Sequence, residues 1–139
     1  MDREPIALKD ARILIVEDDE NNRIVVSRLL ALIGADASRI TLSEGDPVAT
    51  LPAGQDGFDL VLLDLQMPRK DGYTVLGELR TDPRFARARI IALTANVMRQ
   101  DVERARSAGF DGFIGKPIDG RRLGESMRRI MAGEDIWTS

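Results

Sequence analysis

Short apolar runs alternate with longer amphipathic segments along this chain. Residues 13–16, 60–63 and 90–93 consist entirely of Ile, Leu, Val and Ala. Such runs are typical of strands that are buried on both faces of a sheet. Residues 20–33 and 119–131 repeat apolar side chains at helical spacing, so each segment can bury one face as a helix. The pattern predicts buried strands separated by amphipathic helices.

The other predicted elements have weaker patterns. A second strand is expected near residues 39–42, and a last short strand at residues 113–114. Pro and Gly between residues 52 and 57 predict a turn region. Three further helices are expected, in residues 47–51, 73–80 and 97–108.

Five strands alternating with five helices predict an α/β fold, with a parallel sheet covered by helices on both faces. We expect one domain at residues 11–132, an N-terminal arm at residues 1–10 and a C-terminal tail at residues 133–139. In open α/β sheets, ligands bind beyond the carboxyl ends of the strands. The residues that follow each strand are therefore the first candidates for a functional site.

The composition excludes several classes of function. Charged residues make up 31% of the 139 residues, but the formal net charge is only −3. A general nucleic-acid binder would be clearly basic, so none is expected. No apolar run approaches the roughly 20 residues that span a membrane, and the N-terminus lacks the apolar segment of a signal peptide. We therefore expect a cytoplasmic protein that binds neither nucleic acid nor membrane.

The chain contains no cysteine and no histidine. Disulfides, thiol catalysis, imidazole acid/base chemistry and phosphohistidine on this chain are thereby excluded. Carboxylates, hydroxyls, amides, Lys and Arg remain as the chemical groups. Carboxylate oxygens favour hard cations such as Mg²⁺ over zinc or copper.

Polar side chains with related chemistry follow the predicted strands. Clustered carboxylates repel one another, so they favour a compensating cation such as Mg²⁺. An ammonium and a hydroxyl beside them are able to hold phosphate oxygens, because phosphoryl transfer depends mainly on positioning and charge neutralisation. The residues concerned are Glu17, Asp18 and Asp19 after the first strand, Asp64 after the third, Thr94 after the fourth and Lys116 after the fifth.

Each of these residues also has an ordinary structural explanation. Asp19 and Glu20 suit the first turn of a helix, where the helix dipole favours negative charge. Asp64 could cap a helix. Thr94 could simply end a strand, and Lys116 could be an ordinary surface lysine. These explanations would all have to hold at once, at one edge of the sheet. Their coincidence favours a phosphoryl-transfer site.

Four segments identify a family when they are taken together and in order. The chain resembles, over nearly its whole length, the response-regulator receiver domain of two-component signalling. The resemblance implies a flavodoxin-like (βα)5 fold, a doubly wound parallel sheet with strand order 2-1-3-4-5. The segments are Ile13–Asp18, Leu62–Pro68 with Asp71 and Gly72, Ala92–Ala95 and Phe113–Pro117.

The resemblance implies a role for each matching residue. Asp64 would be the phosphoacceptor, and Thr94 and Lys116 would contact the phosphoryl group. Thr94 and Phe113 would form the switch, although Phe113 is also explained as a plain core residue. The peptide bond before Pro117 is expected to be cis.

The resemblance also implies a Mg²⁺ site. Asp18 would be a direct ligand and Glu17 would act through water, with Asp64 and the backbone carbonyl of Gln66 as further ligands. Gln66 and Asn96 occupy positions that tune dephosphorylation in this family.

The expected donor is the phosphohistidine of a histidine kinase or histidine phosphotransfer protein, because a chain without histidine can only receive. The domain would act in signalling and would not be an enzyme beyond its own phosphotransfer and autodephosphorylation. Phosphorylation would change the surface of the fourth helix, fifth strand and fifth helix for an unknown downstream protein. Because only Ala132 to Ser139 follow the last helix, we expect a stand-alone regulator, either a monomer or a phosphorylation-dependent dimer.

The sequence leaves three alternative functions open. The chain is alternatively a receiver module of a larger hybrid histidine kinase, or a degenerate receiver without phosphoacceptor function. An aspartate-nucleophile phosphatase of the haloacid-dehalogenase type also uses Asp, Mg²⁺, Thr and Lys. That class needs a second Asp two residues after the nucleophile, and this chain has Gln66 there.

Two features at the C-terminal end have two explanations each. Arginines on the last helix would form either a docking surface or an ordinary solvated face. The apolar pair Ile136 and Trp137 would either pack back on the domain or form dimer contacts. The arginines are Arg121, Arg122, Arg128 and Arg129.

Overall fold

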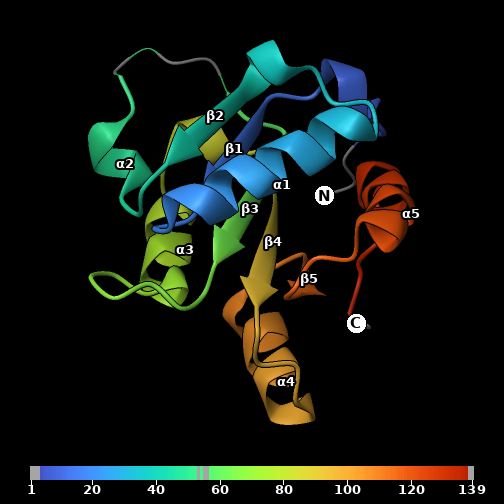
Figure 1. Cartoon of the computed structure of the whole chain (residues 1–139). Coiled ribbons are helices and arrows are strands. Elements are labelled where there is room, and N and C mark those ends of the chain that lie inside the picture. The colour runs from blue at the N-terminus through green and yellow to red at the C-terminus, as the bar shows by residue number, and fades with distance from the viewer. Residues whose placement is uncertain (1–3, 53, 55–56, 138–139) are drawn as a thin grey trace.

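The computed structural model describes residues 4–52, 54 and 57–137. Parts of the expected arm, turn region and tail, namely residues 1–3, 53, 55–56 and 138–139, lie outside these described residues. Five parallel strands form one sheet in the order β2-β1-β3-β4-β5, which confirms the predicted fold (Figure 1). The strands are β1 (Ile13–Val16), β2 (Ile40–Ser43), β3 (Leu60–Asp64), β4 (Arg89–Thr94) and β5 (Gly112–Gly115).

The helices cover both faces of the sheet. Aspartates cap three of them, because the carboxylates of Asp19, Asp71 and Asp119 accept hydrogen bonds from backbone N–H groups in the first turns. Among the described residues, no helix is long and apolar enough to cross a membrane. The helices are α1 (Glu20–Leu32), α2 (Pro47–Thr50), α3 (Gly72–Arg80), α4 (Arg99–Ala108) and α5 (Gly120–Met131).

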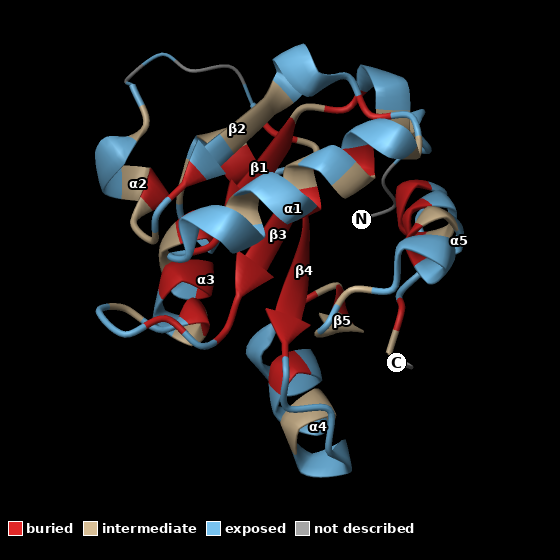
Figure 2. Ribbon diagram, viewed as in Figure 1, coloured by how far each residue is buried: buried red, intermediate tan, exposed pale blue. Residues whose placement is uncertain are grey.

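Alternate residues of the central strands enter two separate apolar layers. On β1, Ile13 and Ile15 pack in the layer that contains the buried residues of α1 and α5. Leu14 and Val16 pack in the other layer, against α3 and α4. Figure 2 shows that β1, β3 and β4 are buried along their lengths. Burial on both faces explains why the interiors of these strands are apolar, with Arg89 at the start of β4 and polar residues at the carboxyl ends of β3 and β4 as the exceptions.

The structure differs from the sequence-based prediction in small details. The second strand begins one residue later than expected, and the helix expected from Val97 begins at Arg99. Val97 and Met98 are 44% and 62% exposed, so their apolar character does not indicate a buried helical face. Three short 3-10 helices were not predicted, because single turns of this kind have no apolar repeat. They are Leu8–Asp10, Ala37–Arg39 and Pro83–Phe85.

The C-terminal tail packs back on the domain. Ile136 forms an isolated parallel bridge with Gly112 at the free edge of β5. The Ile136 side chain is 4% exposed and belongs to the apolar layer of α1 and α5. The first of the two explanations for the apolar tail is therefore confirmed for Ile136.

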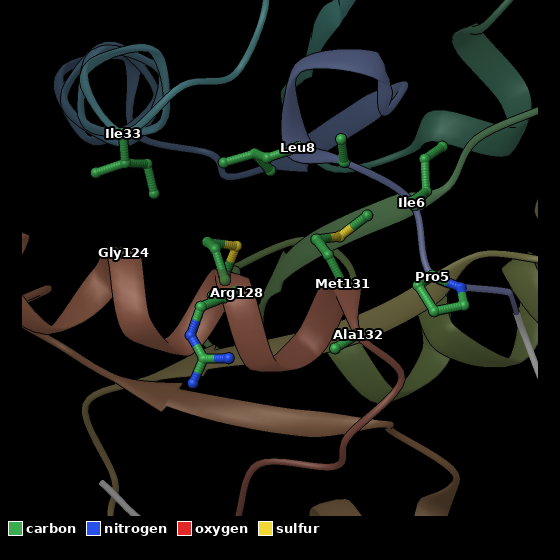
Figure 3. Close-up of a pocket in the computed structure, with 10 residues that line it drawn as sticks. Pro5, Ile6, Leu8, Ile33, Gly124, Arg128, Met131 and Ala132 are labelled. Carbon is green, nitrogen blue, oxygen red and sulfur yellow. The ribbon is translucent and has the colours of Figure 1, made fainter.

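A separate cavity of about 470 Å³ lies beside the N-terminal arm (Figure 3). Its walls come from residues 5–8, from Ile33 at the end of α1, and from α5, and the lining residues other than Arg128 are of apolar types. Arg128 supplies the one charged side chain in this lining, and it is paired with Glu125. The cavity therefore offers no chemical groups comparable with those at the strand ends.

Candidate functional site

The parallel topology brings the predicted site residues to one edge of the sheet. Glu17 and Asp18 follow β1, which lies between β2 and β3. Asp64 and Thr94 are the last residues of β3 and β4, and Lys116 directly follows β5. Because neighbouring parallel strands end together, residues far apart in sequence become neighbours in space (Figure 1).

Three carboxylates form a compact acidic cluster. Glu17, Asp18 and Asp64 each offer one oxygen, and these oxygens all lie within 4.8 Å of one another. Glu17 and Asp64 are only 1% and 2% exposed, whereas Asp18 faces solvent. Partial burial and the neighbouring Glu17 together raise the pKa of Asp18, as expected where negative charges lie close together.

Asp19 is not part of this cluster. Its carboxylate accepts a hydrogen bond of 3.0 Å from the backbone N–H of Asn22, so it caps α1. The ordinary structural explanation is therefore confirmed for Asp19, and the acidic pair of the site is Glu17 and Asp18.

Lys116 connects the two buried carboxylates. Its Nζ atom lies 2.9 Å from Oε2 of Glu17 and 3.0 Å from Oδ1 of Asp64. Burial alone would lower the pKa of Lys116, but the hydrogen bonds to Glu17 and Asp64 raise it overall, so the ammonium stays charged. Three carboxylates and one ammonium leave a formal charge that matches one divalent cation.

Backbone contacts position both members of this ion pair. The N–H of Gln66 donates to Oδ1 of Asp64 at 3.1 Å, the same oxygen that contacts Lys116. The N–H of Lys116 donates to the carbonyl of Thr94 at 2.8 Å, which continues the β4–β5 ladder by one residue. The Lys116–Pro117 bond is cis, as expected. The ammonium and the carboxylate are thus both held by the ends of paired strands.

Thr94 is buried and its hydroxyl group already has partners. Nε2 of Gln66 donates to Oγ1 of Thr94 at 3.0 Å, and the N–H of Asn96 donates to the same oxygen at 2.9 Å. The sequence-based prediction gave the Gln66 carbonyl a ligand role and its position a role in dephosphorylation, but it did not include this side-chain contact with Thr94. The available signal was positional, because Gln66 lies two residues beyond β3 and the adjacent β4 ends at Thr94.

Phe113 lies in the core in this structure. It is 2% exposed and packs in the apolar layer that contains α3 and α4. Because the ring of Phe113 is already buried, this structure gives no sign of a movement of the ring between solvent and core. The switch role of Phe113 stays a prediction.

The arginines of α5 differ in their surroundings. Arg128 pairs with Glu125, and Arg129 pairs with Glu134 at 3.1 Å. Arg121 and Arg122 are exposed near the start of α5. A docking role for these arginines therefore also stays a prediction.

Comparison with known proteins identifies related chains. The family model of the response regulator receiver domain matches residues 13–128. Chemotaxis protein CheY-3 of Vibrio cholerae is 32% identical over 128 residues, which cover 91% of this chain and 96% of that protein. Hybrid signal transduction histidine kinase L of Dictyostelium discoideum is 34% identical over 122 residues.

Many relatives are much longer than this chain. The match covers 85% of this chain but only 7% of the Dictyostelium kinase. It likewise covers 13% of sensor protein GacS of Pseudomonas syringae and 26% of response regulator PleD of Caulobacter vibrioides. The family therefore includes both separate regulators and modules of larger signalling proteins.

Solved structures agree with the sequence relationship. The receiver domain of sensor histidine kinase PA1611 from Pseudomonas aeruginosa has a TM-score of 0.71 and 31% identity, covering 87% of this chain and 97% of that chain. That structure has a magnesium ion coordinated in its active site cleft. CheY4 of Vibrio cholerae, at 22% identity and a TM-score of 0.74, shows the same fold over 86% of this chain and 98% of that one. The chain therefore belongs to the response regulator receiver domain family of two-component signalling.

Proposed function

We propose that Asp64 accepts a phosphoryl group from the phosphohistidine of a histidine kinase or a histidine phosphotransfer protein. The observation that carries this proposal is the buried Asp64 carboxylate, held by Lys116 beside two further carboxylates. The sequence contains no histidine, so a phosphohistidine donor lies outside these 139 residues.

The acidic cluster fits a resident Mg²⁺ ion. It offers oxygen donors alone, and its excess negative charge equals the charge of one such ion. In this proposal Asp18, Asp64 and the backbone carbonyl of Gln66 would hold the ion, with Glu17 acting through water. When bound, Mg²⁺ would supply positive charge against the phosphoryl oxygens.

The proposed transfer is a simple displacement. A carboxylate oxygen of Asp64 forms a bond to phosphorus while the bond between phosphorus and the donor's imidazole nitrogen breaks. The imidazole takes up the electron pair and then a proton from solvent, so no oxidant or further reactant is needed. Lys116 holds the Asp64 carboxylate before the transfer and contacts a phosphoryl oxygen after it.

Phosphorylation would change the contacts of Thr94. The new group carries about −1.5 to −2 charges at neutral pH and offers strong acceptor oxygens. The Thr94 hydroxyl would exchange its contact with Gln66 for a hydrogen bond to a phosphoryl oxygen. Because the end of β4 is hydrogen-bonded to Lys116 beyond β5, a shift at Thr94 would be transmitted to β5.

The output surface in this proposal is formed by α4, β5 and α5. A hollow of about 470 Å³ on this surface extends from Lys116 and Phe113 along α5 to Arg129. Val97 and Met98, which precede α4, are exposed apolar side chains on the β4–α4 connection. A downstream protein would bind here, whether the domain acts as a separate regulator or as a module of a hybrid kinase.

The decisive experiment is incubation with acetyl phosphate and Mg²⁺, followed by intact-mass measurement. We expect one added phosphoryl group on the native chain and none on Asp64→Asn. Asp71→Asn is the matched control, because Asn also caps a helix and the change in charge is the same. Phosphorylation of Asp64→Asn at the native rate would refute the assignment.

A further inference from the structure

The tail returns to β5 after α5 ends. Gly133, with a φ angle of +97°, turns the chain back toward the sheet. The backbone N–H of Phe113 then donates to the carbonyl of Ile136 at 2.8 Å. The tail thereby satisfies a backbone group on the edge strand of the sheet, beside β5 (Figure 1).

Successive side chains of the tail contact opposite sides of the sheet edge. Ile136 is buried in the layer that contains α1 and α5. Trp137 packs against the layer that contains α3 and α4, and its ring lies 4.8 Å from the guanidinium carbon of Arg106. This alternation is that of a short edge strand. We call residues 134–137 the strap.

Gly112 is the residue that allows the strap to approach β5. A Cβ atom at Gly112 would lie 2.8 Å from the carbonyl oxygen of Ile136 and 3.1 Å from its nitrogen. Its next neighbour is a flexible Ile91 methyl group at 3.3 Å, and Gly112 has no positive φ angle. An alanine at this position would therefore clash chiefly with the strap.

The strap lies on the proposed output surface. Ile136 lines the same hollow as Phe113 and Lys116. A partner that binds β5 would meet the strap there. The strap also holds the backbone of Phe113 and thereby the strand that leads to Lys116.

We propose that residues 134–137 form an autoinhibitory strap, which occupies the β5 edge in the unphosphorylated chain and leaves it when Asp64 is phosphorylated. The inference rests on the proposed phosphoacceptor function and adds a regulatory contact to it. Coupling between two sites is reciprocal, so a weaker strap must also favour the phosphorylated state.

Trp137 is the single tryptophan of the chain and reports directly on the strap. We would measure acrylamide quenching of its fluorescence in the full chain, before and after addition of Mg²⁺ and beryllofluoride as the phosphoryl mimic. Binding of the mimic would be followed separately by its fluorine NMR signal. We expect the quenching constant of the native chain to rise at least twofold on binding.

Two variants would weaken the strap from opposite sides. Gly112→Ala displaces it from β5, and Ile136→Ser removes its buried side chain while leaving β5 unchanged. Both should show raised quenching without the mimic, and beryllofluoride midpoints at least threefold lower than native. Gly77→Ala, on the exposed side of α3, is the control and should match the native chain in both measurements.

The possible outcomes separate the two proposals. Bound beryllofluoride with unchanged Trp137 quenching, or native midpoints in both strap variants, would overturn the strap and leave the phosphoacceptor site standing. Absence of any bound fluorine signal would overturn the phosphoacceptor proposal and the strap with it. Lowered beryllofluoride midpoints in both Gly112→Ala and Ile136→Ser would support the strap, because the two changes act on the contact from opposite sides.

Discussion

The residues of the acidic cluster have different surroundings. Glu17 and Asp64 are buried and share the ammonium of Lys116, whereas Asp18 is exposed and has a raised pKa. The excess negative charge is therefore shared between Asp18 and the buried pair of Glu17 and Asp64. A divalent cation would relieve the repulsion between the three carboxylates, and Asp18 contributes one of the two negative charges that Lys116 does not balance.

Mg²⁺ should therefore stabilise the folded chain, with Asp18 as a direct ligand. At a concentration 100-fold above its dissociation constant, the ion would add about 2.7 kcal/mol to the free energy of unfolding. We expect Asp18→Asn to lose most of this gain, measured as the shift of the thermal unfolding midpoint on addition of Mg²⁺. Asp19→Asn should retain the full shift, because Asp19 caps α1 outside the cluster. Equal shifts in both variants would show that Asp18 is not a ligand.

The side-chain contact between Gln66 and Thr94 could not be predicted from the sequence. The residues at the strand ends could be predicted from the sequence, because the first polar residue after each apolar run marks the carboxyl end of a buried strand. The rotamer of Gln66 depends instead on which neighbour lies within reach across two strands. No sequence spacing determines that choice.

The start of α3 lies against the end of β3. A Cβ atom at Gly72 would lie 2.7 Å from the carbonyl oxygen of Asp64 and 2.8 Å from Cα of Leu65. These neighbours are backbone atoms at the end of β3 and in the residue that follows it, so they cannot easily move aside. Gly72 therefore fixes the distance between α3 and β3, the strand that ends on Asp64.

Gly72→Ala should destabilise the chain and slow its phosphorylation. Overpacking of this kind costs about 1–3 kcal/mol, and the displaced Asp64 backbone would misalign the carboxylate. Gly77→Ala in the same helix has no neighbour within 4 Å of the new Cβ atom and should stabilise by about 0.5–1 kcal/mol. Urea denaturation and the acetyl phosphate reaction would measure both effects. Equal stability of the two variants would contradict this account.

Arg84 connects the short α2 region to the rest of the domain. It donates to the carbonyls of Val48, Leu51 and Pro52, and its pairing with Asp82 includes a contact of 2.7 Å. Its hydrogen bonds to Asp82 hold the pKa of that carboxyl below its usual value. The weakly patterned residues 47–52 are thus held by a polar contact that has no signature in the sequence.

The Asp82–Arg84 pair should contribute to stability only above acid pH. Because the pKa of Asp82 is lower in the folded chain, the contribution is complete above its unfolded pKa of about 3.9 and is lost as the pH falls through the folded value. Asp82→Asn keeps the cap and removes the charge. We expect it to be about 1 kcal/mol less stable than native near neutral pH, with the difference shrinking below about pH 4. A difference that is constant with pH would rule out the charge as its origin.

The strands whose positions were predicted from the sequence are the buried ones. The central residues of β1, β3 and β4 are apolar because both faces of these strands are covered, and this pattern is visible in the sequence. β2 is half-buried, and its predicted position was shifted by one residue. The Pro83–Phe85 turn follows a local bond between Asp82 and the N–H of Arg84, which apolar periodicity does not reveal.

At the scale of the whole molecule, the sheet has a rigid centre and two different edges. β1, β3 and β4 each have a neighbour on both sides and are buried. β2 is an edge strand, and its Leu42 is 44% exposed. At the other edge, β5 is met by Ile136 of the tail.

Amide hydrogen exchange should reproduce this order. The amides of Leu62 and Ile91 should exchange only through global unfolding, while those of Thr41 and Leu42 should exchange roughly tenfold faster or more through local opening of the β2 edge. Exchange measured residue by residue by NMR would test the expectation. Equal protection of β2 and β3 would indicate that the whole sheet opens as a single unit.

The two ends of the described chain lie beside the same helix. The N–H of Ile6 donates to the carbonyl of Met131, the last residue of α5, and the tail then passes β5 close by (Figure 1). A longer polypeptide would therefore enter and leave this domain near α5 (Figure 1). Such an architecture allows the domain to be inserted between other modules as a unit. It explains physically how the same fold serves relatives in which it forms 96% of the protein and others in which it forms 7%.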